Sequence, residues 1–171
     1  MRYSGLLLLC VTVLLADSVA GLKWNPPAGW KSQGSTSMRA ATYVLPPAPG
    51  DADNAECVVY FFGAGQGGSV EANIERWKGQ FLQPDGKPAP GKVEKRTVHG
   101  LPVTTIESAG DYAGMGGPMA QGGGAKHKYR LLGAIVEGPG GNVFIKFTGP
   151  EKTVALHQRH YDELLASFEK E

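Results

Sequence analysis

The alternation of apolar and polar residues predicts a chain built mainly of strands. Six stretches are rich in β-branched and aromatic residues and are bounded by Gly, Pro or charged turns, which is typical of strands. These stretches are residues 38–45, 56–62, 93–100, 101–108, 129–137 and 142–148. The second of them is apolar on both faces, which indicates a central strand or one that helices cover.

Two segments show instead the three- and four-residue spacing of an amphipathic helix. The first apolar stripe is formed by Val70, Ile74, Trp77 and Phe81, and Ser69 precedes it as a candidate N-cap. The closing segment has an apolar face made of Val154, Tyr161, Leu164, Leu165 and Phe168. Runs of adjacent strands joined by short turns favour an antiparallel sheet. We therefore expect an α+β domain, with the antiparallel sheet flanked by helices in an α/β/α sandwich.

The start of the chain has the three-part layout of a secretory signal. A positively charged residue precedes an apolar run over residues 6–15, and Ser18 and Ala20 stand three and one residues before a candidate cleavage site. The apolar run is far shorter than the roughly 20 residues that a membrane-spanning helix needs. We therefore predict a signal peptide at 1–20 and one globular domain at 21–171, exported to the periplasm or secreted without a transmembrane anchor.

The two cysteines bear on this prediction in different ways. Cys10 opens the alternative of a bacterial lipoprotein signal, but Leu9 precedes it and the apolar run continues beyond it, which does not fit a lipid-anchored protein. Cys57 is then the only cysteine of the domain, so no internal disulfide can form. Because Cys57 lies in an apolar stretch, we expect a buried and unreactive thiol.

Composition argues against some partners. The formal net charge is +1, and there is no basic stripe with interleaved aromatic residues, so nucleic acid is not an expected partner. Glycine is the outlier at 25 of 171 residues, which is about twice its usual share. Part of this glycine lies in residues 110–126, where the lack of periodicity predicts a flexible hairpin extension.

Two short motifs carry a resemblance to a known fold. Residues 27–30 form a Pro-x-Gly-Trp turn, and residues 164–168 form a Leu-Leu-x-Ser-Phe ending. With its strands and helices, the chain resembles the PsbP-like (Mog/PsbP) fold superfamily, which includes photosystem II extrinsic proteins, a nuclear Ran-binding protein and exported bacterial proteins of unknown role. The Gly-Gly-Ser-x-Glu-x-Asn-x-x-Arg-Trp segment, residues 67–77, is similar to one in uncharacterised exported bacterial proteins. The resemblance implies binding or assembly rather than catalysis.

A glycine-rich turn joins the second predicted strand to the first predicted helix. Residues 63–68 match G-x-G-x-x-G, which lets the backbone approach a dinucleotide pyrophosphate. The match ends there, because Asp85, about 20 residues further on where an acid should end a second strand, falls inside a turn. We expect a tight turn, with positive φ at some glycines, that holds at most a small anion or a partner's carboxylate. The candidate binding residues are Gly65, Gln66, Gly67, Gly68 and Ser69.

Other side chains that could carry chemistry have a structural interpretation as well. On the first helix we expect Trp77 in the core, Asn73 bonded to a neighbouring loop and Arg76 in a surface ion pair. His157 and His160 lie three residues apart on the closing helix and could share a metal, but a solvated helix face explains them better. Met115, Met119 and His127 form a set of soft ligands in the glycine-rich loop, where incidental methionines are the alternative.

These observations favour a non-catalytic binding or assembly module of the cell envelope. Its expected partner is an envelope protein or a small ligand, and no catalytic residue, metal or cofactor is predicted. The alternative is a small-ligand- or metal-binding enzyme that uses the glycine turn at 63–69 or the Met115/Met119/His127 loop.

Overall fold

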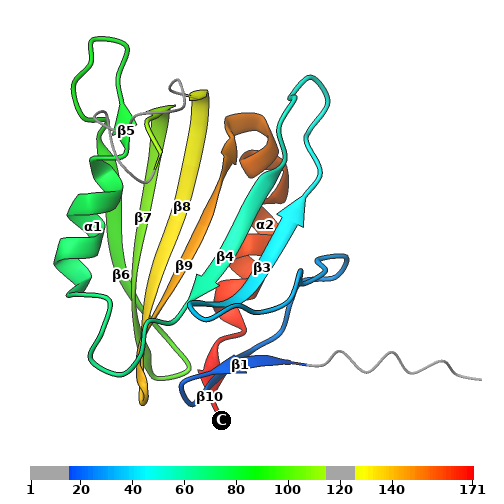
Figure 1. The fold of residues 1–171 in the computed structure, drawn as a ribbon, viewed down its shortest axis with the longest axis vertical. Coiled ribbons are helices and arrows are strands. Elements are labelled where there is room, and N and C mark those ends of the chain that lie inside the picture. The colour runs from blue at the N-terminus through cyan, green and yellow to red at the C-terminus, as the bar shows by residue number, and fades with distance from the viewer. Residues whose placement is uncertain (1–15, 115–125) are drawn as a thin grey trace, which may run out of the picture.

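The computed structural model describes residues 16–114 and 126–171 and contains a large antiparallel sheet. The strand order is β3 (Arg39–Leu45), β4 (Ala55–Tyr60), β9 (Gly141–Pro150), β8 (Lys126–Gly138), β7 (Leu101–Tyr112) and β5 (Phe81–Leu82), with β6 (Gly91–Val98) also paired to β7. Every pairing is antiparallel. Sequential strands β6 to β9 form a meander (Figure 1), as the short turns between apolar runs predicted.

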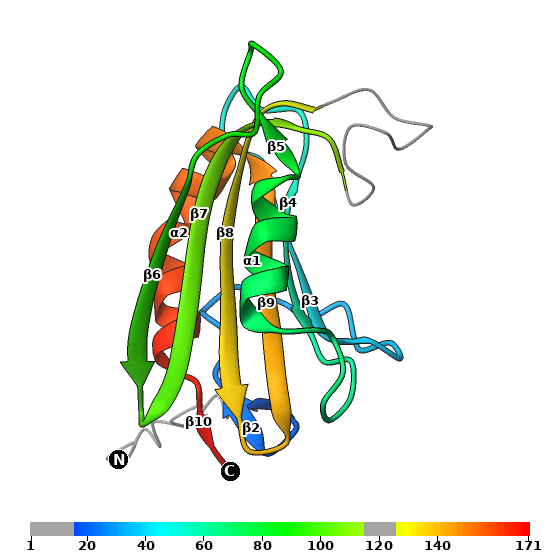
Figure 2. The same cartoon turned by 90° about the vertical axis from the view of Figure 1, so that its left-hand side faces the viewer.

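Two helices lie on opposite faces of this sheet. Figure 2 shows α1 (Val70–Lys78) on one side and α2 (Glu151–Ala166) on the other, with the strands between them. The three layers confirm the predicted α+β class and the α/β/α sandwich. Neither helix of the described residues is long and apolar enough to cross a membrane.

The face under α2 holds the larger part of the core. Along β3, β4 and β9, the alternate residues that point to this face are apolar and buried, and Phe147 of β9 stacks on Tyr161 of α2 with ring centroids 5.7 Å apart. Trp24 and Trp30 are both buried in the same cluster. Cys57 also lies in this cluster and is fully buried, as its apolar surroundings predicted.

The face under α1 has a smaller core, built around Trp77. An added Cβ at Gly133 of β8 would lie 2.7 Å from the Trp77 ring, so a residue without a side chain is needed for the indole to approach the strand. Ile74 and Phe81 join the same cluster. The predicted helical stripe therefore packs as expected, but Phe81 itself lies in β5, because the helix ends at Gly79.

A second, three-stranded sheet joins the two ends of the described chain. It consists of β1 (Asp17–Val19), β2 (Leu22–Trp24) and β10 (Glu169–Lys170). β1 lies on the N-terminal side of the cleavage site predicted before Gly21, and cleavage there would remove it. The processing of residues 1–20 stays a prediction.

The predicted hairpin extension at 110–126 is partly described. β7 continues through Tyr112 and β8 begins at Lys126, so both strands run further than the apolar pattern indicated. Met115 and Met119 lie outside the described residues, and so does the middle of the predicted loop.

Candidate functional site

A groove of about 410 Å³ lies on the α1 face of the sheet, between α1 and the strands β4 and β9. α1 covers one part of this face and leaves the part formed by β3 and β4 without a helix (Figure 1). The groove is lined by aromatic, cationic and neutral polar side chains, namely Thr36, Met38, Arg39, Tyr60, Phe62, Arg76, Trp77, Gln80, Phe144 and Lys146. No carboxylate from residues 16–114 or 126–171 lines it, so the site is formally cationic.

Lys146 lies at the centre of this site. It is part of β9, and only 7% of it is exposed. Its ammonium donates a hydrogen bond to Gln80 Oε1 at 2.8 Å, and it lies 5.8 Å from the centroid of the Trp77 ring and 6.0 Å from that of Tyr112. Among the described residues no carboxylate lies within ion-pair distance of its Nζ. A buried amine held only by an amide oxygen and ring faces retains donors for another group.

The surroundings of Lys146 disfavour its positive charge. Burial, together with the smaller effect of the nearby Arg76 guanidinium, lowers the pKa of this amine from 10.5 to about 8. Desolvation disfavours the charged form of any amine, and a like charge adds to that effect. An anion placed in the groove would reverse both effects, so the electrostatics of the site favour an anionic ligand.

Gln80 is itself held in place by the fold. Its backbone N–H donates to the Trp77 carbonyl at 3.2 Å, just after α1 ends, and its carbonyl accepts from the Ala113 N–H at 3.0 Å. The α1 terminus and the end of β7 therefore fix the amide that orients Lys146.

Aromatic rings form the walls of the groove. Tyr60 and Phe62 stack at 5.8 Å with nearly parallel planes, and Phe62 meets Phe144 at 5.5 Å. Burial raises the pKa of the Tyr60 hydroxyl, so the residue stays neutral. Flat walls of this kind fit a flat apolar molecule.

A shallower hollow of about 270 Å³ adjoins the groove and shares Arg39, Tyr60 and Lys146 with it. Apart from that of Lys146, the cationic charges in this hollow are already paired. Arg39 bonds to Glu56 at 3.0 Å, and Lys126 lies 3.1 Å from Asp53. The unpaired cationic charge is therefore concentrated in the groove rather than in this hollow.

Arg76 differs from the prediction made for it. Its guanidinium donates to the side-chain oxygen of Asn73, and no ion pair joins it to a carboxylate of the described residues. It lines the groove on the α1 side. The expected surface ion pair is wrong, because the nearest acceptor on the helix is an amide and not an acid.

The glycine turn folds as a connection between strand and helix. Gly65, Gly67 and Gly68 all have positive φ, at +70°, +89° and +83°, as predicted. Ser69 Oγ accepts from the Ala72 N–H at 3.1 Å and caps α1. Asn73 is buried, and its amide donates to the carbonyls of Gly67 and Ser69 at 2.8 Å each, which confirms its predicted loop contact. The anion site at Gly65–Ser69 stays a prediction.

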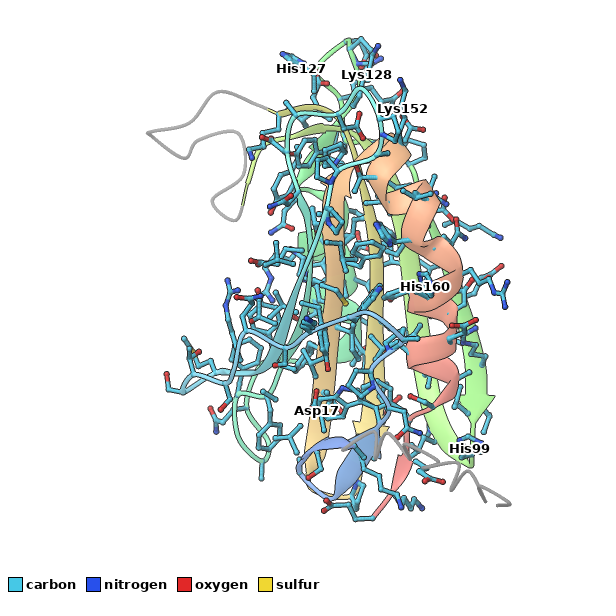
Figure 3. The ribbon with its side chains drawn as sticks, turned by 90° about the vertical axis from the view of Figure 1, so that its right-hand side faces the viewer. Asp17, His99, His127, Lys128, Lys152 and His160 are labelled. Atoms are coloured by element: carbon cyan, nitrogen blue, oxygen red, sulfur yellow. The ribbon has the colours of Figure 1, made fainter. Side chains whose placement is uncertain are left out.

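The candidate histidines lie in two separate parts of the molecule. His160 lies along α2 and His127 lies near the far end of the sheet (Figure 3). His157 and His160 are half-buried with ring centroids 6.0 Å apart, and His160 meets Trp30 at 6.3 Å, so the expected solvated face is wrong. His127 is exposed, with Nδ1 at 3.0 Å from Asp111. Within residues 16–114 and 126–171, no three His, Cys, Asp or Glu side chains converge as a metal site.

Two solved structures share the architecture. One is PA94, a protein of unknown function from Pseudomonas aeruginosa, with a TM-score of 0.50 and 15% identity over 89% of this chain and 93% of that one. The other is the cyanobacterial PsbP (CyanoP) from Synechocystis, with a TM-score of 0.51 and 13% identity over 100% of this chain and 99% of that one. The fold is PsbP-like. At these identities the likeness concerns the fold alone, and no protein-family model and no curated sequence matches the chain.

Sequence reasoning missed the groove. Lys146 is the single charged residue in the apolar run of the last strand, Asn142–Thr148. A lysine at an alternate position of a strand otherwise buried on both faces is the signal that could have found it. The partners Gln80 and Tyr60 come from distant parts of the chain, and no local pattern links them to Lys146.

Proposed function

We propose that this protein is an exported, non-catalytic binding protein of the cell envelope, and that its ligand occupies the groove around Lys146. The ligand class is a small, flat, apolar molecule that carries a carboxylate. The observation that carries the proposal is the buried Lys146 ammonium, which faces an aromatic cavity and has no carboxylate partner among the described residues.

The energetic argument concerns the cost of burying an amine. A pKa lowered from 10.5 to about 8 corresponds to a penalty of about 3 kcal/mol on the charged form in the folded protein. A carboxylate held against Lys146 would restore the interaction that burial removed, and a buried, hydrogen-bonded ion pair is stronger than an exposed one. The stacked rings of Tyr60 and Phe62 would hold the apolar body.

Export is the other part of the proposal. It is supported by the apolar run over residues 6–15 and by the small residues Ser18 and Ala20 ahead of the predicted cleavage site. An envelope protein partner, which the sequence also allowed, would be compatible with a ligand in the groove.

The experiment is calorimetric titration of the full chain with naphthoate, with naphthylmethanol as the neutral analogue of the same shape. Lys146→Met keeps the volume of the side chain and removes its charge, and Lys152→Met removes an exposed charge from α2, which covers the other face of the sheet. We expect naphthoate to bind wild type and Lys152→Met equally, and to bind Lys146→Met at least about tenfold more weakly. Equal affinity for naphthoate and naphthylmethanol, or no loss in Lys146→Met, would contradict the proposal.

A further inference from the structure

We propose that Lys146 Nζ condenses with aldehydes that enter the groove and holds them as a reversible imine, so that the preferred ligands are aromatic aldehydes bearing an anionic group. The proposal rests on the groove being the ligand site, as proposed above. It adds a covalent step that anion binding alone does not require.

Lys146 can be reached by a ligand although it is largely buried. Lys146 lines both the groove and the adjoining hollow, so its amine meets open volume although the residue is 7% exposed. Gln80 Oε1 accepts one hydrogen bond from the amine at 2.8 Å. The Trp77 and Tyr112 rings, whose centroids lie 5.8 and 6.0 Å from Nζ, do not engage the nitrogen lone pair. The amine is therefore held in place without an ion pair that would have to break before it could react.

The walls also exclude competing chemistry. Trp77 and Phe144 are almost fully buried beside the amine and bring no nucleophile or acid to it. An aromatic aldehyde stacked between such walls would hold its carbonyl carbon close to Nζ, because a flat molecule has few other orientations there. An imine is protected from hydrolysis where water is displaced by rings.

Lys146 is also more often unprotonated than an ordinary lysine. With burial and Arg76 lowering its pKa to about 8, the neutral fraction near pH 7.5 is larger by on the order of 100-fold than at a pKa of 10.5. Desolvation beside a second cation is a known way of activating a lysine as a nucleophile.

The step balances without an oxidant or reductant. The lone pair of neutral Nζ attacks the carbonyl carbon, a C–N bond forms, and the C=O pair becomes a hydroxyl after proton transfer from nitrogen. The nitrogen lone pair then forms the C=N bond as the C–O bond breaks, and the leaving hydroxide takes the remaining N–H proton, so that amine and aldehyde give imine and water. An anionic group on the ligand would face the guanidinium of Arg76, which lines the same groove and has no carboxylate partner among the described residues.

The test is reductive trapping with a formylnaphthoate. The full chain is incubated with this aldehyde and cyanoborohydride, which adds hydride to the imine and fixes it as a secondary amine, and the adduct is located by peptide mass mapping. We expect one adduct, on Lys146, formed at least about tenfold faster than on any other lysine. Lys152→Met should react as wild type does, and Lys146→Met should lose this fast adduct.

Two matched compounds separate this inference from the proposed function. Methylnaphthoate has the anion and no carbonyl, so it should bind and slow the trapping of formylnaphthoate. Naphthaldehyde has the carbonyl and no anion, so its adduct should form more slowly. Labelling spread over surface lysines, or unchanged in Lys146→Met, would overturn the imine while methylnaphthoate binding kept the proposed function intact. Absence of both binding and trapping would overturn both.

Discussion

The two faces of the sheet differ although the same strands supply both. On β9, Phe147 is fully buried against α2, while its neighbour Lys146 lies in the groove on the opposite face. The α2 face is packed against apolar side chains of the helix, namely Val154, Tyr161, Leu164 and Leu165. The α1 face is covered over only part of its extent, because α1 has 9 residues against 16 in α2 and lies away from β3 and β4 (Figure 1).

The difference between the two faces separates the residues that stabilise the fold from the residues that are available to a ligand. A face that served stability alone would place an apolar residue at position 146, because a buried amine without a carboxylate weakens the folded state. Among the described residues the cluster under α2 contains no lysine, and the polar atoms buried there without a hydrogen-bond partner, such as Trp30 Nε1 and the Tyr161 hydroxyl, belong to neutral side chains. The buried amine that weakens the folded state therefore lies in the groove, which is expected where a ligand supplies the missing carboxylate.

The largest expected effect comes from truncating the packed face. Phe147→Ala should lower the free energy of unfolding by about 3–5 kcal/mol, because the ring is fully buried between α2 and Trp30. Phe62→Ala, which shortens a partly buried ring of the groove wall, should cost less than about 2 kcal/mol. Urea unfolding of both variants measures this. Equal losses would show that the groove wall is packed as core.

Lys146→Met should raise the free energy of unfolding, in contrast to the two truncations. Since the folded pKa of Lys146 lies near 8, below its unfolded value of 10.5, the unfolded state binds more protons between these values. Wild-type stability therefore gains with rising pH in that window, and the full penalty of about 3 kcal/mol is present below it. Lys146→Met lacks this penalty, so its advantage should shrink by about 2 kcal/mol between about pH 7 and pH 10.

Urea unfolding of wild type and Lys146→Met at several pH values measures this advantage. Taking the difference between the two proteins cancels the tyrosines, which also titrate near the upper limit of the window. Lys152→Met is the control, and it should show a small difference from wild type that does not vary in this way. An advantage of Lys146→Met that stayed constant with pH would contradict the assigned burial of the amine.

The glycine turn offers a smaller comparison within one segment. Gly65 and Gly67 both have positive φ, but only Gly67 has rings close to its Cα. An added Cβ at Gly65 meets nothing within 4 Å, so Gly65→Ala should cost about 1 kcal/mol from backbone strain. At Gly67 the Cβ would lie 2.8 Å from Phe62 and from Phe144, so the loss should reach about 2 kcal/mol or more. Equal losses would mean that the rings move aside freely.

The Cys57 thiol should not react with thiol reagents while the protein is folded. Burial raises the pKa of its thiol well above the usual range, and the side chain is fully buried on the α2 face. A bulky thiol reagent should label it only in denaturant. Rapid labelling of the native protein would show that the reagent reaches the α2 face, and would contradict the burial of Cys57.

The fold was largely predictable because its signals are local. β-branched runs, the helical stripes and the Ser69 cap each depend on residues close in sequence. They lie where they were predicted except at the ends of the two stripes, since Phe81 and Phe168 both follow their helices. The boundaries failed where tertiary contacts decide them. Phe81 has helical spacing from Trp77, but it pairs with Tyr112 in the sheet, and no residue near Phe81 encodes that partner.

The groove could not be predicted for the same physical reason. Its polar centre joins Gln80, which follows α1, to Lys146, which lies 66 positions later in β9. The prominent sequence motif was the glycine turn, whose positive φ values serve the connection and let Phe62 and Phe144 approach its backbone. The turn therefore positions the groove wall, and its contribution to the site is structural.

The most direct test of the central claim is proton uptake on binding naphthoate, measured by titration calorimetry in buffers of different ionisation enthalpy. If the carboxylate pairs with Lys146, binding raises the pKa of that amine from about 8, and near pH 8 the complex should take up roughly half a proton. Lys146→Met should take up none, and Lys152→Met should match wild type. Binding without proton uptake, or uptake that persists in Lys146→Met, would contradict the account.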